Sequence, residues 1–89
     1  MDNVLRRSLV KNVEKYLFEC PGCGQMHFFY DEKPLVWNHS WSHPTLNHIL
    51  VFGTQERRCI FAMIKGEIHF SKECHHQYAD KVRPMIPWE

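Results

Sequence analysis

Long apolar runs are missing from this sequence. The first ten residues, MDNVLRRSLV, contain no uninterrupted apolar stretch like that of a signal peptide, and no segment approaches the ~20 apolar residues of a membrane span. We therefore expect a cytoplasmic chain with no membrane partner. In that reducing compartment, cysteines at motif spacing are more often metal ligands than disulfides, so the four cysteines favour zinc.

An excess of charge of one sign is also absent. The sequence has 11 Lys and Arg against 10 Asp and Glu, a net charge of +1, so no overall field directs it to nucleic acid. It has no repeat, low-complexity linker or long charge block either, which predicts one domain over residues 1–89. The core of so short a chain is marginal, and small domains often add a metal or a partner.

Short strands account for much of the hydrophobic pattern. MHFFY, residues 26–30, and HILVFG, residues 48–53, are rich in aromatic or β-branched residues and are bounded by turn signals. Residues 1–17 fit either one helical stripe or two strands around Lys11 and Asn12, and periodicity alone does not choose between them.

A hairpin is predicted over residues 58–74, with Lys65 and Gly66 as its two-residue turn. The resulting pairs are Ile64 with Glu67, Met63 with Ile68, Ala62 with His69, and Phe61 with Phe70. This register places four large apolar side chains on one face, which we expect to be buried.

The overall prediction is a mainly β, antiparallel, zinc-stapled domain of zinc-ribbon type. We expect a short helical turn over residues 74–80, followed by an extended tail that Pro84 and Pro87 impose.

The metal site is predicted from cysteine spacing. Cys20 and Cys23 lie three apart in CPGCG, where proline and two glycines let backbone amides turn toward the sulfurs. Counting outward from the hairpin turn brings Cys59 and Cys74 to one end of that hairpin. These four thiolates would hold one structural zinc ion in a tetrahedral site. His76 is an alternative fourth ligand, and His27 is a more remote candidate.

A catalytic zinc keeps an open position for water, and four cysteines leave none. We therefore lean against an enzyme, and no catalytic residue is predicted. A zinc-dependent hydrolase or nuclease is the least favoured function, with Glu73 as its general base.

The order of the motifs resembles that of a known family. The sequence runs through CPGCG with His27, Trp37, PTL at residues 44–46, Cys59 before a glycine-turn hairpin, ECHHQYAD at residues 73–80, and a closing Pro and Trp. This order is similar to that of small phage-encoded proteins often labelled "ammonia monooxygenase", over most of the chain. The resemblance implies a phage or prophage origin and a zinc-ribbon-like β fold, and it implies no activity.

The resemblance covers the predicted ligands and one further motif. The matching positions are Cys20, Cys23, Pro44, Thr45, Leu46, Cys59, Cys74 and His76. Ile60 stands where the family tends to have histidine, which removes a candidate ligand and favours the all-cysteine site. Glu73 replaces an aspartate, and His48 with Ile49 replaces a Pro-Ser step.

The favoured function is binding to a host or phage protein. Trp41, His43 and Pro44 lie in a loop with few charges, and interface cores are enriched in aromatic residues. The alternative is a nucleic-acid-binding zinc ribbon. In that case the basic residues near the start would join Arg57 and Arg58 in one basic edge; those near the start are Arg6, Arg7, Lys11 and Lys15.

Overall fold

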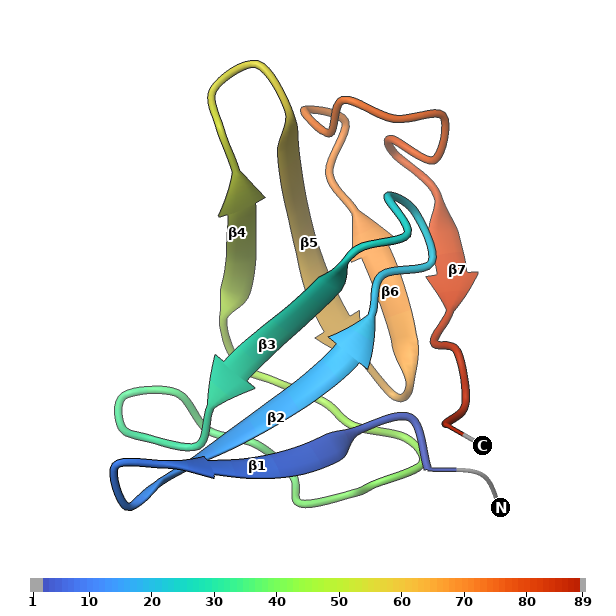
Figure 1. Ribbon diagram of the computed structural model, residues 1–89. Helices are drawn as coiled ribbons and strands as arrows, with labels where there is room; N and C mark the ends of the chain where they lie inside the picture. Colours follow the sequence, from blue (N-terminus) through green and yellow to red (C-terminus); the bar gives the residue numbers. More distant parts are fainter. Residues whose placement is uncertain (1–2, 89) are drawn as a thin grey trace.

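The computed structural model describes residues 3–88, which form two antiparallel sheets that cross each other (Figure 1). The first sheet has the order β1-β2-β3, with β1 Arg6–Val10, β2 Val13–Glu19 and β3 Met26–Tyr30. The second has the order β4-β5-β6-β7, with β4 Ile49–Gly53, β5 Arg58–Ile64, β6 Glu67–Phe70 and β7 Val82–Pro84. The predicted mainly β, antiparallel fold of zinc-ribbon type is confirmed. Residues 1, 2 and 89 of the predicted domain lie outside the described residues.

The ambiguous start of the chain forms a hairpin. Lys11 and Asn12 have positive φ angles of 48° and 67°, as a two-residue hairpin turn of the favoured twist requires. Tyr16 and Phe18 alternate toward the core along β2, with 3 % and 1 % of their surface exposed. Burial of this alternating face in the core therefore selects strands over the helical stripe.

The hairpin predicted over residues 58–74 has the expected register as far as Phe70. The pairs Phe61–Phe70, Ala62–His69, Met63–Ile68 and Ile64–Glu67 are all observed. The inward side chains Phe61, Met63, Ile68 and Phe70 are each at most 5 % exposed. The turn residues Lys65 and Gly66 have φ angles of 49° and 78°. Local turn chemistry and alternation were therefore sufficient to predict this hairpin.

Replacing Gly66 with alanine tests how closely this turn packs. The new Cβ would lie 2.9 Å from the backbone oxygen of Ser42, which is too close. The φ of 78° is a second cost, because residues other than glycine rarely adopt it. We expect Gly66→Ala to lower the free energy of unfolding by about 2–3 kcal/mol, measured by urea denaturation. Gly24→Ala is the matched control, because Gly24 has a φ of 75° and no atom within 4 Å of such a Cβ. Equal losses in the two variants would show that packing adds nothing.

The core lies where β2 and β3 pass diagonally across β5 and β6 (Figure 1). The ring of Phe18 meets that of Phe61 edge to face, with centroids 5.8 Å apart. Cys20, Cys59 and Cys74 are buried members of the same cluster. Three of the four cysteines are therefore buried in the core.

The predicted helical turn over residues 74–80 is wrong, and no helix occurs in residues 3–88. Isolated turns replace it, such as those closed by Cys74 N–H on Ser71 O and by Ala79 N–H on His76 O. The segment is instead attached to β5, because His75 N–H donates to the carbonyl of Arg58. Backbone groups bonded to a strand are not free to continue a helix.

The expected extended tail adds one further strand. Pairs of β6 with β7 include Glu67 with Pro84 and His69 with Val82. Proline has no N–H group to donate to a neighbouring strand. Pro84 is tolerated in β7 because β7 is the last strand of its sheet, with a neighbouring strand on one side alone.

Candidate metal centre

The CPGCG segment forms the tip of the β2–β3 hairpin. Cys20 N–H donates to Gln25 O over 2.8 Å, and Gly24 N–H donates to Cys20 O over 3.0 Å. Gly24 has a positive φ of 75°, which glycine adopts without steric cost. This tight turn folds the chain back so that Cys23 approaches the start of β3.

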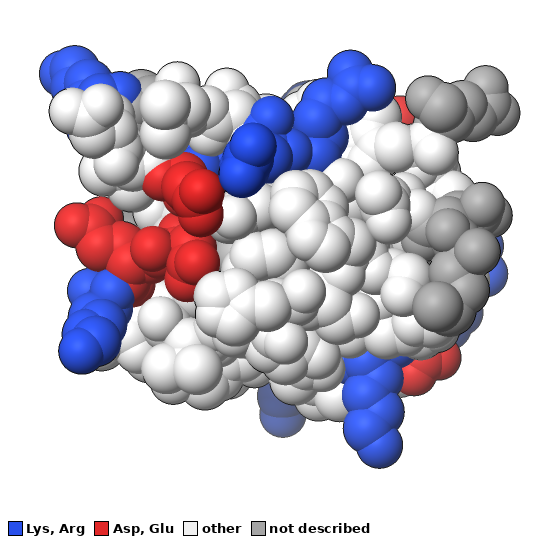
Figure 2. Space-filling model, turned by 90° about the horizontal axis from the view of Figure 1, so that it is seen from below, with Lys and Arg blue, Asp and Glu red and all other residues white. Residues whose placement is uncertain are grey.

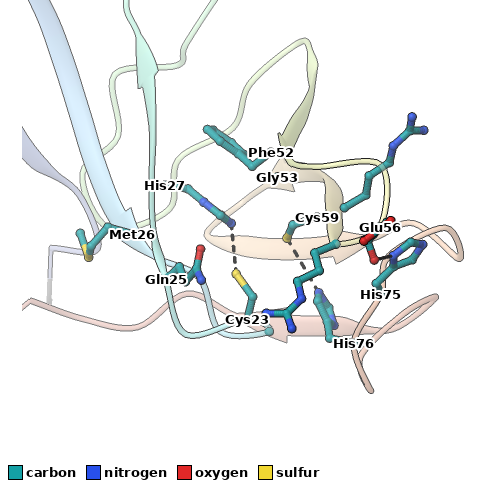
Figure 3. A pocket seen from close by; sticks show the side chains of 13 residues that line it. Cys23, Gln25, Met26, His27, Phe52, Gly53, Glu56, Cys59, His75 and His76 are labelled. Atoms are coloured by element: carbon teal, nitrogen blue, oxygen red, sulfur yellow. Dashed lines mark hydrogen bonds between the residues drawn. The ribbon is translucent and has the colours of Figure 1, made fainter.

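His27 lies on β3 next to this turn. Its Nε2 is 3.3 Å from the Sγ of Cys23, and the residue is 4 % exposed. The imidazole stacks on Phe52, with centroids 4.2 Å apart and ring planes 6° apart, and also on Phe61. Aromatic packing from β4 and β5 therefore fixes the direction of this nitrogen (Figure 3).

Cys59 on β5 completes the group from the other sheet. Its Sγ is 3.6 Å from the Sγ of Cys20. The donor atoms of Cys20, Cys23, His27 and Cys59 all lie within 4.8 Å of one another, close enough to share a metal ion. Three donors come from the hairpin of the first sheet and one comes from the second sheet, so a bound ion would join the sheets.

The other predicted ligands form a second group around Cys59. The donor atoms of Cys59, Cys74 and His76 also lie within 4.8 Å of one another. Cys59 therefore belongs to both groups, with Cys20 and Cys23 in the first and Cys74 and its alternative His76 in the second.

Sequence reasoning gave His27 too little weight. The register of the CPGCG hairpin places His27 opposite Phe18, whose side chain points to the same face as Cys20 two residues later. Counting the register inward from this turn would have identified the histidine as a neighbour of both cysteines.

Hydrogen bonding between buried thiols lowers one pKa and raises another. The pKa of Cys20 falls to about 3, first because of the hydrogen bond with Cys59, against the opposing effect of burial. The pKa of Cys59 is raised, first by the same hydrogen bond and then by burial. Burial raises the pKa of Cys23. The hydrogen bond therefore favours the thiolate form of Cys20 and the thiol form of Cys59, and metal binding would release the Cys59 proton.

A pocket of about 690 Å³ opens over the centre. Its wall includes Cys23, His27, Cys59 and His76, whose side chains converge in Figure 3. Cys23 is exposed, whereas the other two cysteines of the first group are buried. All four cysteines are free, so no disulfide competes for them.

Comparison with known proteins adds no family. The chain matches no protein-family model, no curated protein and no solved structure. In the described residues, no helix has the length and apolar character needed to cross a membrane. The proposed function is therefore based on the geometry of the cysteine cluster.

The residues predicted for partner binding lie largely inside the protein. Pro44 is fully buried, and Trp41 is half-buried, with its ring centroid 5.5 Å from that of Tyr16. His43 is exposed. Of the predicted surface, His43 and part of Trp41 are accessible to a partner.

The basic residues do not meet in one edge. Arg6 and Arg7 lie on β1, whereas Arg57 and Arg58 lie where the β4–β5 loop enters β5, at the opposite end of the molecule (Figure 1). From below, basic residues lie at separate points around a mostly uncharged face (Figure 2). Glu73, the predicted general base, is exposed and is not part of the pocket wall.

Proposed function

We propose that this chain is a zinc-stapled β module in which the metal is structural, and that it acts by binding another protein. The main support for a structural metal is the origin of the four donor atoms, of which three come from the β2–β3 hairpin and one comes from β5. Because all four positions are filled by protein atoms, this ion has no vacancy for a catalytic water.

Distances in the first group support zinc as the ion. Tetrahedral zinc, with bonds of about 2.3 Å to sulfur and 2.0–2.1 Å to nitrogen, separates two sulfurs by about 3.8 Å and a sulfur from a nitrogen by about 3.6 Å. The observed Cys20–Cys59 separation is 3.6 Å, and that of Cys23 Sγ from His27 Nε2 is 3.3 Å. Three thiolates and one imidazole form a common structural zinc set.

The exposed side of β4 supports protein binding. Ile49 and Val51 are 68 % and 60 % exposed and point to the same side, because they are two residues apart on a strand. As an end strand of its sheet, β4 pairs with β5 alone, and an extended segment of another protein can add to such an edge. The resemblance to phage-encoded proteins suggests a host or phage protein as that partner.

Capture from a host lysate with the zinc-loaded chain tests the binding surface. We expect the Val51→Lys variant to retain at least ten-fold less host protein than the unchanged sequence, because it places a charge on the docking side. Leu9→Lys is the matched control, because Leu9 is 67 % exposed on the other sheet. Equal retention by both variants would contradict binding at β4. Retention of nucleic acid that falls steeply with salt would favour the nucleic-acid alternative.

A further inference from the structure

Cys74 and His76 are unused by the four-donor centre, although both lie next to it. The Nε2 of His76 is 3.8 Å from the Sγ of Cys59. The His76 ring also lies against the CPGCG turn, because a Cβ on Gly22 would come within 2.7 Å of its Nε2. Cys74 is 6 % exposed and belongs to the core cluster. The second group therefore lies beside the first, with Cys59 and Cys74 buried and His76 in the wall of the pocket.

We propose that Cys59, Cys74 and His76 form a second metal subsite, which takes a divalent, zinc-type ion joined to the first through the Cys59 thiolate. This inference rests on the proposed zinc centre, because the shared sulfur is a ligand of both. Sulfur and imidazole donors select the same class of ion in each group. A thiolate has lone pairs for two metal bonds, so Cys59 is able to serve both groups.

Charge balance favours two ions over one. Three thiolates and one divalent ion leave the first group with a net charge of about −1. A second divalent ion together with the Cys74 thiolate contributes about +1, so the two groups together are neutral. Cys59 and Cys74 are 4 % and 6 % exposed, and an uncompensated charge is costly at such depth. The second ion thus neutralises the buried negative charge that remains when only the first ion is bound.

Backbone contacts of Cys74 prepare it to be a thiolate ligand. The N–H of Ile60 donates to its Sγ over 3.2 Å, a contact that strengthens when the sulfur is ionised. Its S–H donates to Ile60 O over 3.0 Å, and this bond is lost when the metal takes the proton's place.

Binding at His76 requires a change of tautomer. The Nδ1 of His76 accepts the Tyr78 N–H over 3.2 Å, which leaves the proton of the neutral ring on Nε2. A metal bond at Nε2 moves that proton to Nδ1 and breaks the contact with Tyr78. Because this subsite loses two hydrogen bonds and has three protein donors, it binds its ion more weakly than the first. Cys59 and His76 line the pocket, so a pocket water is able to fill the fourth position.

Metal counting on the full chain tests the second subsite. The reduced, metal-free protein is titrated with Zn²⁺, and bound ions are counted by native mass spectrometry and elemental analysis. We expect two ions per chain in two steps of different affinity, and one ion in both Cys74→Ser and His76→Ala. His75→Ala is the matched control and should keep two, since His75 belongs to neither group. The ¹¹³Cd-loaded chain should give two NMR signals coupled through the shared sulfur.

The outcomes separate this inference from the proposed zinc centre. One tightly bound ion in the unchanged sequence, with no second ion at excess Zn²⁺, would overturn the second subsite and leave the first intact. No bound ion would overturn both. Two ions retained by both Cys74→Ser and His76→Ala would place the second ion elsewhere and overturn the subsite. If His76→Ala does not fold, the Cys74→Ser count decides.

Discussion

Removal of zinc should abolish the cooperative unfolding transition of this domain. Structural zinc contributes an apparent binding free energy of about 10–16 kcal/mol in small zinc domains, whereas whole domains are stable by about 5–15 kcal/mol. Here the ion would also join Cys20 and Cys59, whose sulfurs lie 3.6 Å apart and come from different sheets. We therefore expect a strong chelator to flatten the thermal transition followed by circular dichroism, and added Zn²⁺ to restore it.

Single ligand variants show which side chains hold this ion. His27→Ala should lose the transition at stoichiometric Zn²⁺, because it removes the nitrogen donor next to Cys23. His43→Ala is the control and should unfold like the unchanged sequence, since His43 is exposed and belongs to neither donor group. A transition that survives complete metal removal would show that packing alone holds the sheets together.

Phe61→Ala should cause the largest loss of stability among substitutions outside the metal ligands. The side chain is 1 % exposed and lies between the two sheets. Its ring meets Phe18 edge to face at 5.8 Å and stacks on Phe52 at 5.9 Å and on His27 at 5.7 Å. Truncation of a buried phenylalanine costs about 3–5 kcal/mol, much of the stability of a typical domain.

Urea denaturation at saturating zinc measures this loss. Ile64→Ala on the same strand is the matched control, because Ile64 points outward and is 38 % exposed. We expect the control to lose less than about 1 kcal/mol. Phe61→Ala should also weaken zinc binding, since it removes one of the rings that orient His27. Similar losses in the two variants would contradict the proposed division of β5 into a buried and an exposed face.

Local patterns predicted the second sheet better than they predicted the metal ligands. The turn at Lys65 and Gly66 fixes its own register, so every pair counted from it is correct as far as Phe70. Just past Phe70, Ser71 N–H still bonds to the opposite Ile60 O, and the chain then turns, with Cys74 N–H bonding back to Ser71 O. Counting past that point correctly placed Cys74 beside Cys59, but the structure brings only Cys59 into one group with Cys20 and Cys23.

Contacts distant in sequence decided the remaining elements. Residues 1–17 carried equal support for a helix and a hairpin, and burial of Tyr16 and Phe18 in the core selects the hairpin. The segment 74–80 had a plausible helical pattern, but its backbone is attached to β5. Single-sequence periodicity does not contain either contact.

The strand order has a consequence for how the molecule folds. Every sheet pairing joins strands adjacent in the sequence, so each sheet is a meander that can form from local contacts, which favours fast folding. The meeting of Cys20 and Cys59, by contrast, closes a separation of 39 residues. Loop closure of this length is entropically unfavourable until contacts across it form. We therefore expect the two meanders to form first and metal capture to set the rate of their docking.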